Sequence, residues 1–253
     1  MPTADSERRA PAHHQARLQA VHQGPNMAID AWSRSALANG HKLLTITAPT
    51  DPYAQTGPSV LSPHDLHPPS TPARLVQAAL ADGFTGLSVL IRADHVIAET
   101  SAEFHNAVES ALTALCAEHP VRVLCIYDRP GAGTEHLNLA VTHHRGGLQE
   151  HLLTVREGED CTCLAGEVDL TNVDVFNAAL SACRTTTDDI VRLDLSEIAF
   201  LSAGAANILL RHTTTPRDGL ARVELHNPPR HIRRLLWLTG RAVRTADRSR
   251  HQR

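Results

Sequence analysis

The stretch VRLDLSEIAFLSAGAANILL (residues 191–210) joins an apolar run to a helical pattern through a short turn. The run up to Leu201 has the composition of a buried strand. Ser202 follows as a typical N-cap residue, and small and apolar residues continue to Leu210. A helix start carries free backbone N–H groups and partial positive charge. Ser202 is therefore either a helix cap or a residue suited to carry phosphate.

The pattern continues on both sides of this stretch. Two strands joined by a Gly-Glu-Asp turn precede it and favour an antiparallel pair. The other elements that we expect are a helix over 171–185, a strand over 221–227 and a last helix over 229–240. Together these elements predict one compact α/β domain over residues 148–242. In the last helix we expect Ile232, Leu235, Leu236 and Leu238 to face the sheet.

The first half of the chain also alternates strands and helices. We expect strands over 41–48, 85–94 and 121–128, and helices over 71–83, 101–120 and 135–144. Ser101 is a candidate N-cap, and Pro120 ends the long helix that it begins. The alternation predicts an α/β domain over residues 15–147 with a largely parallel sheet. A Pro- and Ser-rich loop at about 49–72 interrupts it, and we expect 1–14 and 243–253 to be flexible tails.

The break between the two patterns is HHRGG (143–147). Glycines beside polar residues favour a hinge or solvated linker over a metal site at His143 and His144. We therefore place the domain boundary between Thr142 and Glu150.

Composition excludes several classes of protein. The chain has 253 residues, a hydrophobic content of 42% and a net charge of −3, which suits two packed domains and argues against a nucleic-acid binder. No apolar run reaches the ~20 residues that span a bilayer. The amino-terminal residues lack the apolar region of a signal peptide, so we expect a cytoplasmic protein without membrane association. Five cysteines without a secretion signal indicate reduced thiols.

Motifs of enzymes and metal sites are missing from the sequence. It contains no HExxH, no repeated CxxC, no GxSxG and no Walker motif. Cys161 and Cys163 lie two residues apart and should share one face of a strand, but no second pair is spaced to complete a zinc site. We therefore expect no catalysis, no cofactor and no metal.

Three segments of the second half resemble a STAS domain, the fold of bacterial anti-sigma factor antagonists. They are LAGEVDLTN (164–172), VRLDLSEIAFLSAGAANILL (191–210) and VELHNPPRHIRRLLWLTG (223–240). The resemblance implies a docking module without catalysis, whose partner is an anti-sigma factor that doubles as a switch kinase. It places partner contacts on two neighbouring loops: Asp169, Leu170, Thr171 and Asn172, and Ser202, Ala203, Gly204, Ala205 and Ala206.

The tip of the central strand departs from the usual STAS pattern of Phe-hydrophobic-Asp-Ser-Ser/Ala-Gly. Ser202 stands at the aspartate, and Ala203 stands at the serine that the partner kinase phosphorylates. Because Ala203 has no hydroxyl, phosphorylation at that position is impossible. Ser202 remains as a candidate phosphosite, with a plain helix cap as the other interpretation.

The first half resembles the MEDS sensory domain, which occurs ahead of STAS domains in actinobacterial proteins. The matching residues are 78–94, the helix that begins AEFHNAVESAL, and EHPVRVLCIYDRP (118–130). The resemblance implies an α/β domain that senses a small ligand. The family's usual His-x-Cys opening is not present here, and residues 18–30 offer only His22 as a candidate for the pocket. Cys125, Tyr127 and Asp128 at a strand end are either the rim of that ligand pocket or parts of the core.

These observations predict a regulatory protein, an anti-sigma factor antagonist with a ligand-sensing amino-terminal domain. The alternative is a small-molecule-binding protein whose STAS half serves packing or formation of a homodimer.

Overall fold

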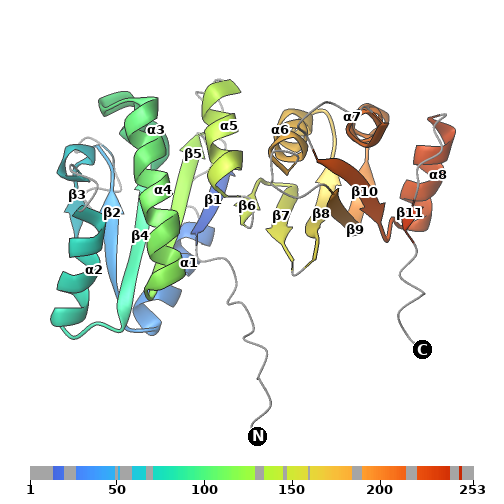
Figure 1. Cartoon of the computed structure of the whole chain (residues 1–253). Coiled ribbons are helices and arrows are strands. Elements are labelled where there is room, and N and C mark those ends of the chain that lie inside the picture. Colours follow the sequence, from blue (N-terminus) through green and yellow to red (C-terminus); the bar gives the residue numbers. More distant parts are fainter. Residues whose placement is uncertain are drawn as a thin grey trace, which may run out of the picture.

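The computed structural model describes residues 14–19, 27–48, 51, 59–66, 71–128, 134–144, 147–158, 160–183, 190–214, 221–239 and 245–246. Their strands form one sheet in the order β11-β10-β9-β8-β7-β6-β1-β5-β4-β2-β3 (Figure 1). Strand β7 runs antiparallel to both its neighbours, and the other pairs of this sheet are parallel. The predicted mixed α/β fold with a largely parallel sheet is confirmed.

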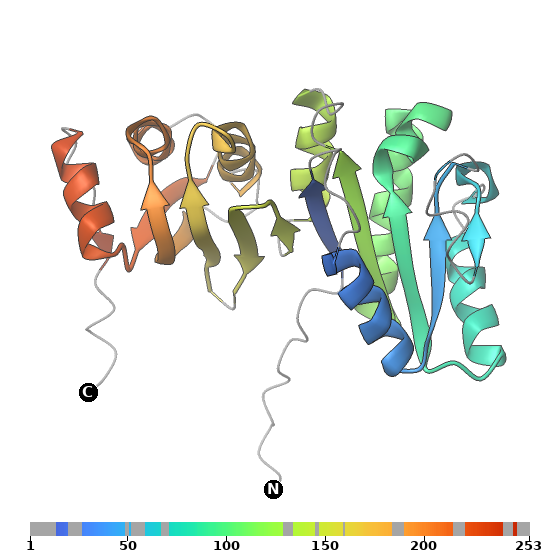
Figure 2. The ribbon, with the colours of Figure 1, turned by 180° about the vertical axis from the view of Figure 1, so that it is seen from behind.

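The amino-terminal half places helices on both faces of its strands. The strands are β1 (His14–Gln19), β2 (His41–Ile46), β3 (Val60–Leu61), β4 (Gly86–Arg92) and β5 (Val121–Asp128). Helices α2 (Thr71–Ala81), α4 (Ala102–Glu118) and α5 (Thr134–His143) cover one face, and α1 (Met27–Ala38) lies on the other (Figures 1 and 2). The short helix α3 (Ala93–Glu99) continues directly from β4. Every residue of β4 is buried, as expected of a strand covered on both faces.

Helix α4 shows how the sequence sets the bounds of an element. Ser101 is its N-cap, and the Oγ atom accepts a hydrogen bond of 3.1 Å from the backbone N–H of Phe104. Val108, Leu112 and Leu115 form a buried stripe at helical spacing. The predicted cap at Ser101 is confirmed.

The carboxyl-terminal half has helices on one face. Its strands are β6 (Leu148–Gln149), β7 (Leu153–Glu157), β8 (Thr162–Val168), β9 (Ile190–Leu201), β10 (Arg222–His226) and β11 (Thr245–Ala246). Helices α6 (Val173–Cys183), α7 (Ala203–Thr214) and α8 (Arg230–Leu238) pack on them; both views show α6 and α7 end-on above the strands and α8 at the end of the sheet (Figures 1 and 2). The predicted antiparallel pair of β7 and β8 is confirmed.

Several elements were not predicted from the sequence, and β1 is the most central of them. It lies between β5 and β6, and of its residues only His14 falls in the expected amino-terminal tail. The segment expected as a carboxyl-terminal tail includes β11, which pairs with β10. Elements α1, β3, α3 and β6 were likewise missed.

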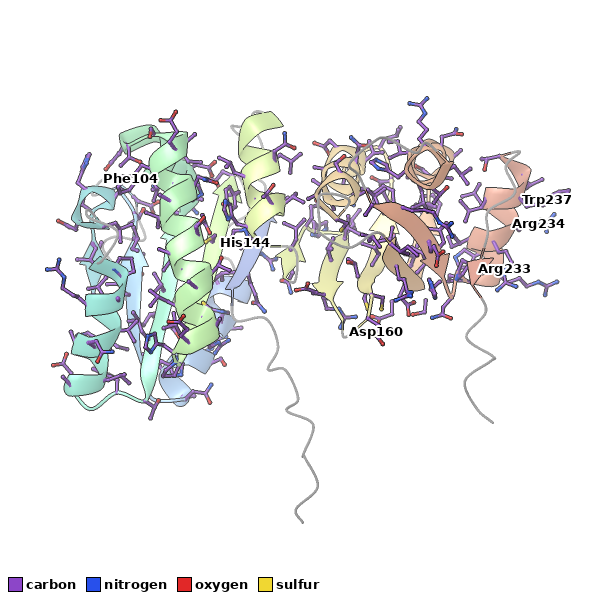
Figure 3. The ribbon with its side chains drawn as sticks, viewed as in Figure 1. Phe104, His144, Asp160, Arg233, Arg234 and Trp237 are labelled. Carbon is purple, nitrogen blue, oxygen red and sulfur yellow. The ribbon has the colours of Figure 1, made fainter. Side chains whose placement is uncertain are left out.

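The prediction for Leu238 in α8 is wrong. Ile232 and Leu236 are buried and Leu235 is partly buried, but Leu238 is 62% exposed. A residue two positions after Leu236 lies about 200° further around the helix, which turns it away from the sheet. Trp237 is also exposed and projects from this end of the molecule (Figure 3).

The sheet passes through the expected domain boundary by way of β6. Leu148 of β6 pairs with Ala16 of β1 on one side and with Val155 of β7 on the other. The backbone N–H of Ala16 also donates to the Gly147 oxygen at 2.9 Å. Ala16, Leu148 and Val155 belong to one continuous apolar core. The division into domains at residues 147 and 148 stays a prediction.

Candidate functional site

Strands β8 and β9 bring the two predicted contact segments to one end of the sheet. Val168, the last residue of β8, pairs with Leu201, the last residue of β9. The backbone N–H of Ser202 donates to the Val168 oxygen at 2.8 Å. The loop that begins at Asp169 and the helix that begins after Ser202 therefore start side by side.

A bulge in β8 shapes this end of the strand. The register between β8 and β9 shifts between Gly166 and Glu167. Gly166 has a φ of +98°, and a Cβ atom there would lie 2.0 Å from the Leu152 oxygen. Only glycine fits this close approach to the neighbouring strand, and its backbone angle is one that other residues rarely adopt.

Hydrogen bonds hold the loop between β8 and α6 in one shape. The Asp169 carboxylate accepts from the backbone N–H of Thr171 at 2.7 Å and from its hydroxyl at 2.6 Å. The Asn172 side chain accepts from the Asp169 N–H at 3.0 Å and donates to the Glu167 oxygen at 2.9 Å. Between these fixed points Leu170 is 83% exposed. The loop thus presents an apolar side chain to solvent on a stiff support.

Ser202 caps α7. Its Oγ atom accepts a hydrogen bond of 3.2 Å from the backbone N–H of Ala205, and its carbonyl accepts one of 2.9 Å from the Ala206 N–H. The cap interpretation of Ser202 is therefore confirmed. Whether Ser202 also accepts phosphate stays a prediction.

The predicted contact residues differ in their exposure. Leu170, Thr171, Ala203 and Gly204 are exposed, and Asp169 and Ser202 are partly exposed. Three side chains belong to the core, contrary to the prediction: Asn172, Ala205 and Ala206. The two alanines lie on the side of α7 that packs on the sheet, and Asn172 is held inside its loop.

Phe200 is a surface residue that the sequence analysis did not assign to the site. It pairs with Glu167 of β8 and is 48% exposed. Side chains alternate across a strand, so the buried position of Leu201 places Phe200 on the outer face. That alternation, together with its aromatic ring, is the signal that could have identified it.

Residues 154–242 match the family model described as Mlab, STAS domain. This part of the chain is a STAS domain. The match begins in β7 and extends past α8, so it includes both loops of the candidate site. The search of curated proteins finds no match to the chain.

The residues predicted to form a ligand pocket in the amino-terminal half lie in different surroundings. His22 lies outside the described residues. Cys125 and Tyr127 are fully buried, so of the two interpretations these residues fit the core and not the rim of an open pocket. Both side chains point to the side of β5 that α4 covers. Asp128 is partly exposed and accepts a hydrogen bond of 2.7 Å from Arg92.

A buried polar cluster lies between α4, β5 and the end of α5. Glu109 and His105 of α4 are fully buried, as is His144, which Figure 3 labels at the end of α5. We expected His144 in a solvated linker, and that prediction is wrong. The Tyr127 hydroxyl lies 3.0 Å from the His105 Nε2 atom and donates to Glu109 at 3.3 Å.

Burial and the Glu109 carboxylate act together on nearby acidic groups. Desolvation, reinforced by the negative charge of Glu109, raises the pKa of Tyr127 and that of Cys125 well above their ordinary values. The same two causes raise the pKa of Cys116 to about 12. These three groups are therefore protonated near neutral pH.

An ion-pair group lies at the carboxyl ends of β4 and β5. Arg92 contacts Asp128 at 2.7 Å and Asp51 at 3.3 Å, and Asp51 also lies 3.0 Å from the His95 Nδ1 atom. The Asp94 carboxylate accepts from the Asp128 backbone N–H at 2.5 Å. Arg92 and Asp51 are nearly fully buried, so these pairs join the segments after three strands.

The structure also bears on the predictions for the Cys161 and Cys163 pair and for membrane-spanning segments. Cys161 lies directly before β8 and Cys163 lies within it, and their sulfur atoms are 3.8 Å apart, so the two side chains lie on the same side, as predicted. Among the described helices, none is long and apolar enough to span a bilayer.

Proposed function

We propose that the STAS domain docks an anti-sigma factor that doubles as a switch kinase, through the ends of β8 and β9. The docking surface consists of Asp169, Leu170, Thr171, Phe200, Ser202, Ala203 and Gly204. The observation that carries the proposal is Leu170, which is 83% exposed at the tip of a hydrogen-bonded loop.

The energetics of docking favour this surface. An exposed leucine gains free energy when a partner removes it from water, about 25 cal/mol for each Å² of apolar area buried. A loop already fixed by Asp169 and Asn172 loses little conformational freedom on binding. Polar side chains around Leu170 and Phe200 supply the rim that protein interfaces typically have.

The alanine at position 203 bears on how docking is controlled in this protein. Because the usual phosphorylated position has no hydroxyl, we propose that docking is constitutive or controlled by the amino-terminal half. That half serves as the MEDS-like sensory domain of a cytoplasmic anti-sigma factor antagonist, and neither half has a catalytic role.

Co-purification followed by direct binding tests this proposal. The tagged chain should recover an ATP-binding anti-sigma factor, identified by mass spectrometry, and the two purified proteins should bind in calorimetry. Recovery of no such protein, or a recovered protein that does not bind directly, would contradict the proposal.

Incubation of the complex with ATP tests its control. We expect no phosphate on Ser202 and no loss of the complex. Stoichiometric phosphate on Ser202 with dissociation of the complex would restore a phosphorylation switch at a shifted residue.

A further inference from the structure

Three side chains from separate segments meet in the core of the amino-terminal half. They are Glu109 of α4, Cys125 of β5 and His144, which follows α5. All three are buried, and their carboxylate, sulfur and imidazole ligand atoms lie within 4.8 Å of one another. We propose that they form a binding site for a divalent transition metal of the zinc class, with three protein ligands and a fourth position for water.

The orientation of His144 supports this assignment. Its Nδ1 atom lies 2.7 Å from the Ala140 carbonyl oxygen, which can only accept, so Nδ1 carries the hydrogen. Its Nε2 atom then faces the Glu109 Oε2 atom at 3.3 Å. A neutral imidazole would direct a lone pair at a carboxylate oxygen, an arrangement that requires a proton or a cation nearby. Metal-binding histidines commonly use this same bond from the other ring nitrogen to a backbone carbonyl.

His105 occupies the opposite side of the same carboxylate. Its Nε2 atom lies 3.2 Å from Glu109 Oε1. Metal bonds of about 2.0–2.1 Å to nitrogen and oxygen separate tetrahedral ligands by roughly 3.3–3.4 Å. The 3.3 Å between Glu109 and His144 agrees with that spacing. His105 stands outside the group of three ligand atoms and holds the other carboxylate oxygen in place.

The charges of these groups also suit a divalent ion. A Glu109 carboxylate and a Cys125 thiolate together carry two negative charges, and His144 binds as a neutral ligand. Coordination releases the Cys125 thiol proton to solvent, and the filled site has no net charge. A neutral site avoids most of the large cost of burying a charge in the core. The mixture of sulfur, nitrogen and oxygen ligands favours zinc-class ions over Mg²⁺ or Ca²⁺, which prefer oxygen.

The test uses Co²⁺, which reports thiolate ligation by a near-ultraviolet charge-transfer band. The full chain should carry Cys161→Ser and Cys163→Ser, because this pair of neighbouring thiols could bind metal itself. Since the proposed site is fully buried, the protein is loaded both by incubation and by refolding with Co²⁺. We expect a single equivalent bound, tetrahedral visible bands and the thiolate band, all displaced by Zn²⁺.

Matched variants assign the ligands. Cys125→Ser should abolish the thiolate band, and Cys183→Ser, at a buried cysteine of the STAS domain, should leave it unchanged. His144→Gln should weaken Co²⁺ binding at least tenfold, with folding checked by circular dichroism.

Three results would overturn the site: no thiolate band after refolding with Co²⁺, a band that survives Cys125→Ser, or a band that Cys183→Ser removes. If Cys125→Ser fails to fold, Cys116→Ser and Cys183→Ser, added singly, assign the band by elimination. It must then survive both substitutions, and its loss in either would contradict the proposal.

Discussion

The two halves of the sheet keep their polar side chains in different places. In the amino-terminal half, His105, Glu109 and His144 are buried together, and Arg92 and Asp51 form a second buried group. In the STAS domain, the buried polar residues among those described are Asn172 and Asp194. Asn172 bonds within its own loop, and Asp194 bonds to Ser196 of β9 and to Asn227 after β10. The amino-terminal half therefore gathers polar and ionisable groups in its interior, whereas the STAS domain has its candidate site on the surface.

The largest expected effect concerns the apolar packing of the STAS domain. Leu236→Ala removes a fully buried side chain from α8 and should lower the free energy of unfolding by about 2–5 kcal/mol. Leu238→Ala in the same helix is the control and should change it by less than ~0.5 kcal/mol, since Leu238 is largely exposed. Urea unfolding measures both, and equal effects would show that α8 packs differently.

The second prediction compares the alkylation rate of a cysteine in the amino-terminal half with that of a cysteine in the STAS domain. With a pKa of about 12, Cys116 carries roughly a thousandth of the thiolate of an ordinary thiol at pH 8. The greater nucleophilicity of a basic thiolate recovers part of this loss, so we expect alkylation roughly 30- to 100-fold slower than for an ordinary thiol. The rate should rise with pH up to about 12, because the thiolate fraction rises.

Iodoacetamide labelling of the native chain, mapped by mass spectrometry, measures this difference. Cys163, which is partly exposed in the STAS domain, serves as the internal comparison. Equal labelling of Cys116 and Cys163 would mean that the core of the amino-terminal half opens readily.

The third prediction addresses the docking surface. Leu170→Asp should weaken binding of the anti-sigma partner roughly tenfold, because it places a charge at the centre of an apolar contact. Leu238→Asp is the matched control, since it makes the same change at another exposed leucine, on α8. Calorimetric titration of both variants decides whether the partner binds at the surface around Leu170 or at α8. Loss of binding only in Leu238→Asp would move the interface to α8.

The smallest effect is expected at the cap of α7. Ser202→Ala removes the acceptor of the Ala205 N–H bond and should lower the stability by ~1 kcal/mol. Ser202→Asp should leave the stability nearly unchanged, because aspartate caps as well as serine, while weakening partner binding at this surface. Thermal melts separate the two substitutions, and a large loss of stability in both would contradict a simple cap.

The sequence carried more information about the STAS domain than about the amino-terminal half. The strand ending at Leu201 and the cap at Ser202 follow from local composition, and the motifs around them match the family model. Strand β1 was missed because its residues, HQARLQ, are mostly polar and give no run of apolar residues. It is stabilised in the sheet by pairing with β5 and β6, which local sequence does not reveal.

The buried polar cluster was missed for a related reason. Glu109 occupies a position in α4 that resembles an ordinary solvated helix face, and His144 stands in a Gly-rich segment. Their separation from Cys125 along the chain follows no known ligand spacing. Only the packing of α4 and α5 over β5 brings them together. Likewise, the burial of Ala205 and Ala206 depends on which side of α7 packs on the sheet.

The two edges of the sheet have a consequence for self-assembly. The described sheet ends at β3 on one side and at β11 on the other, and each of these strands has two residues. An edge this short offers a second chain few backbone groups with which to pair. Side-by-side polymerisation of copies into a longer sheet is therefore disfavoured, even though the parallel strands in between would extend readily if a long edge were exposed.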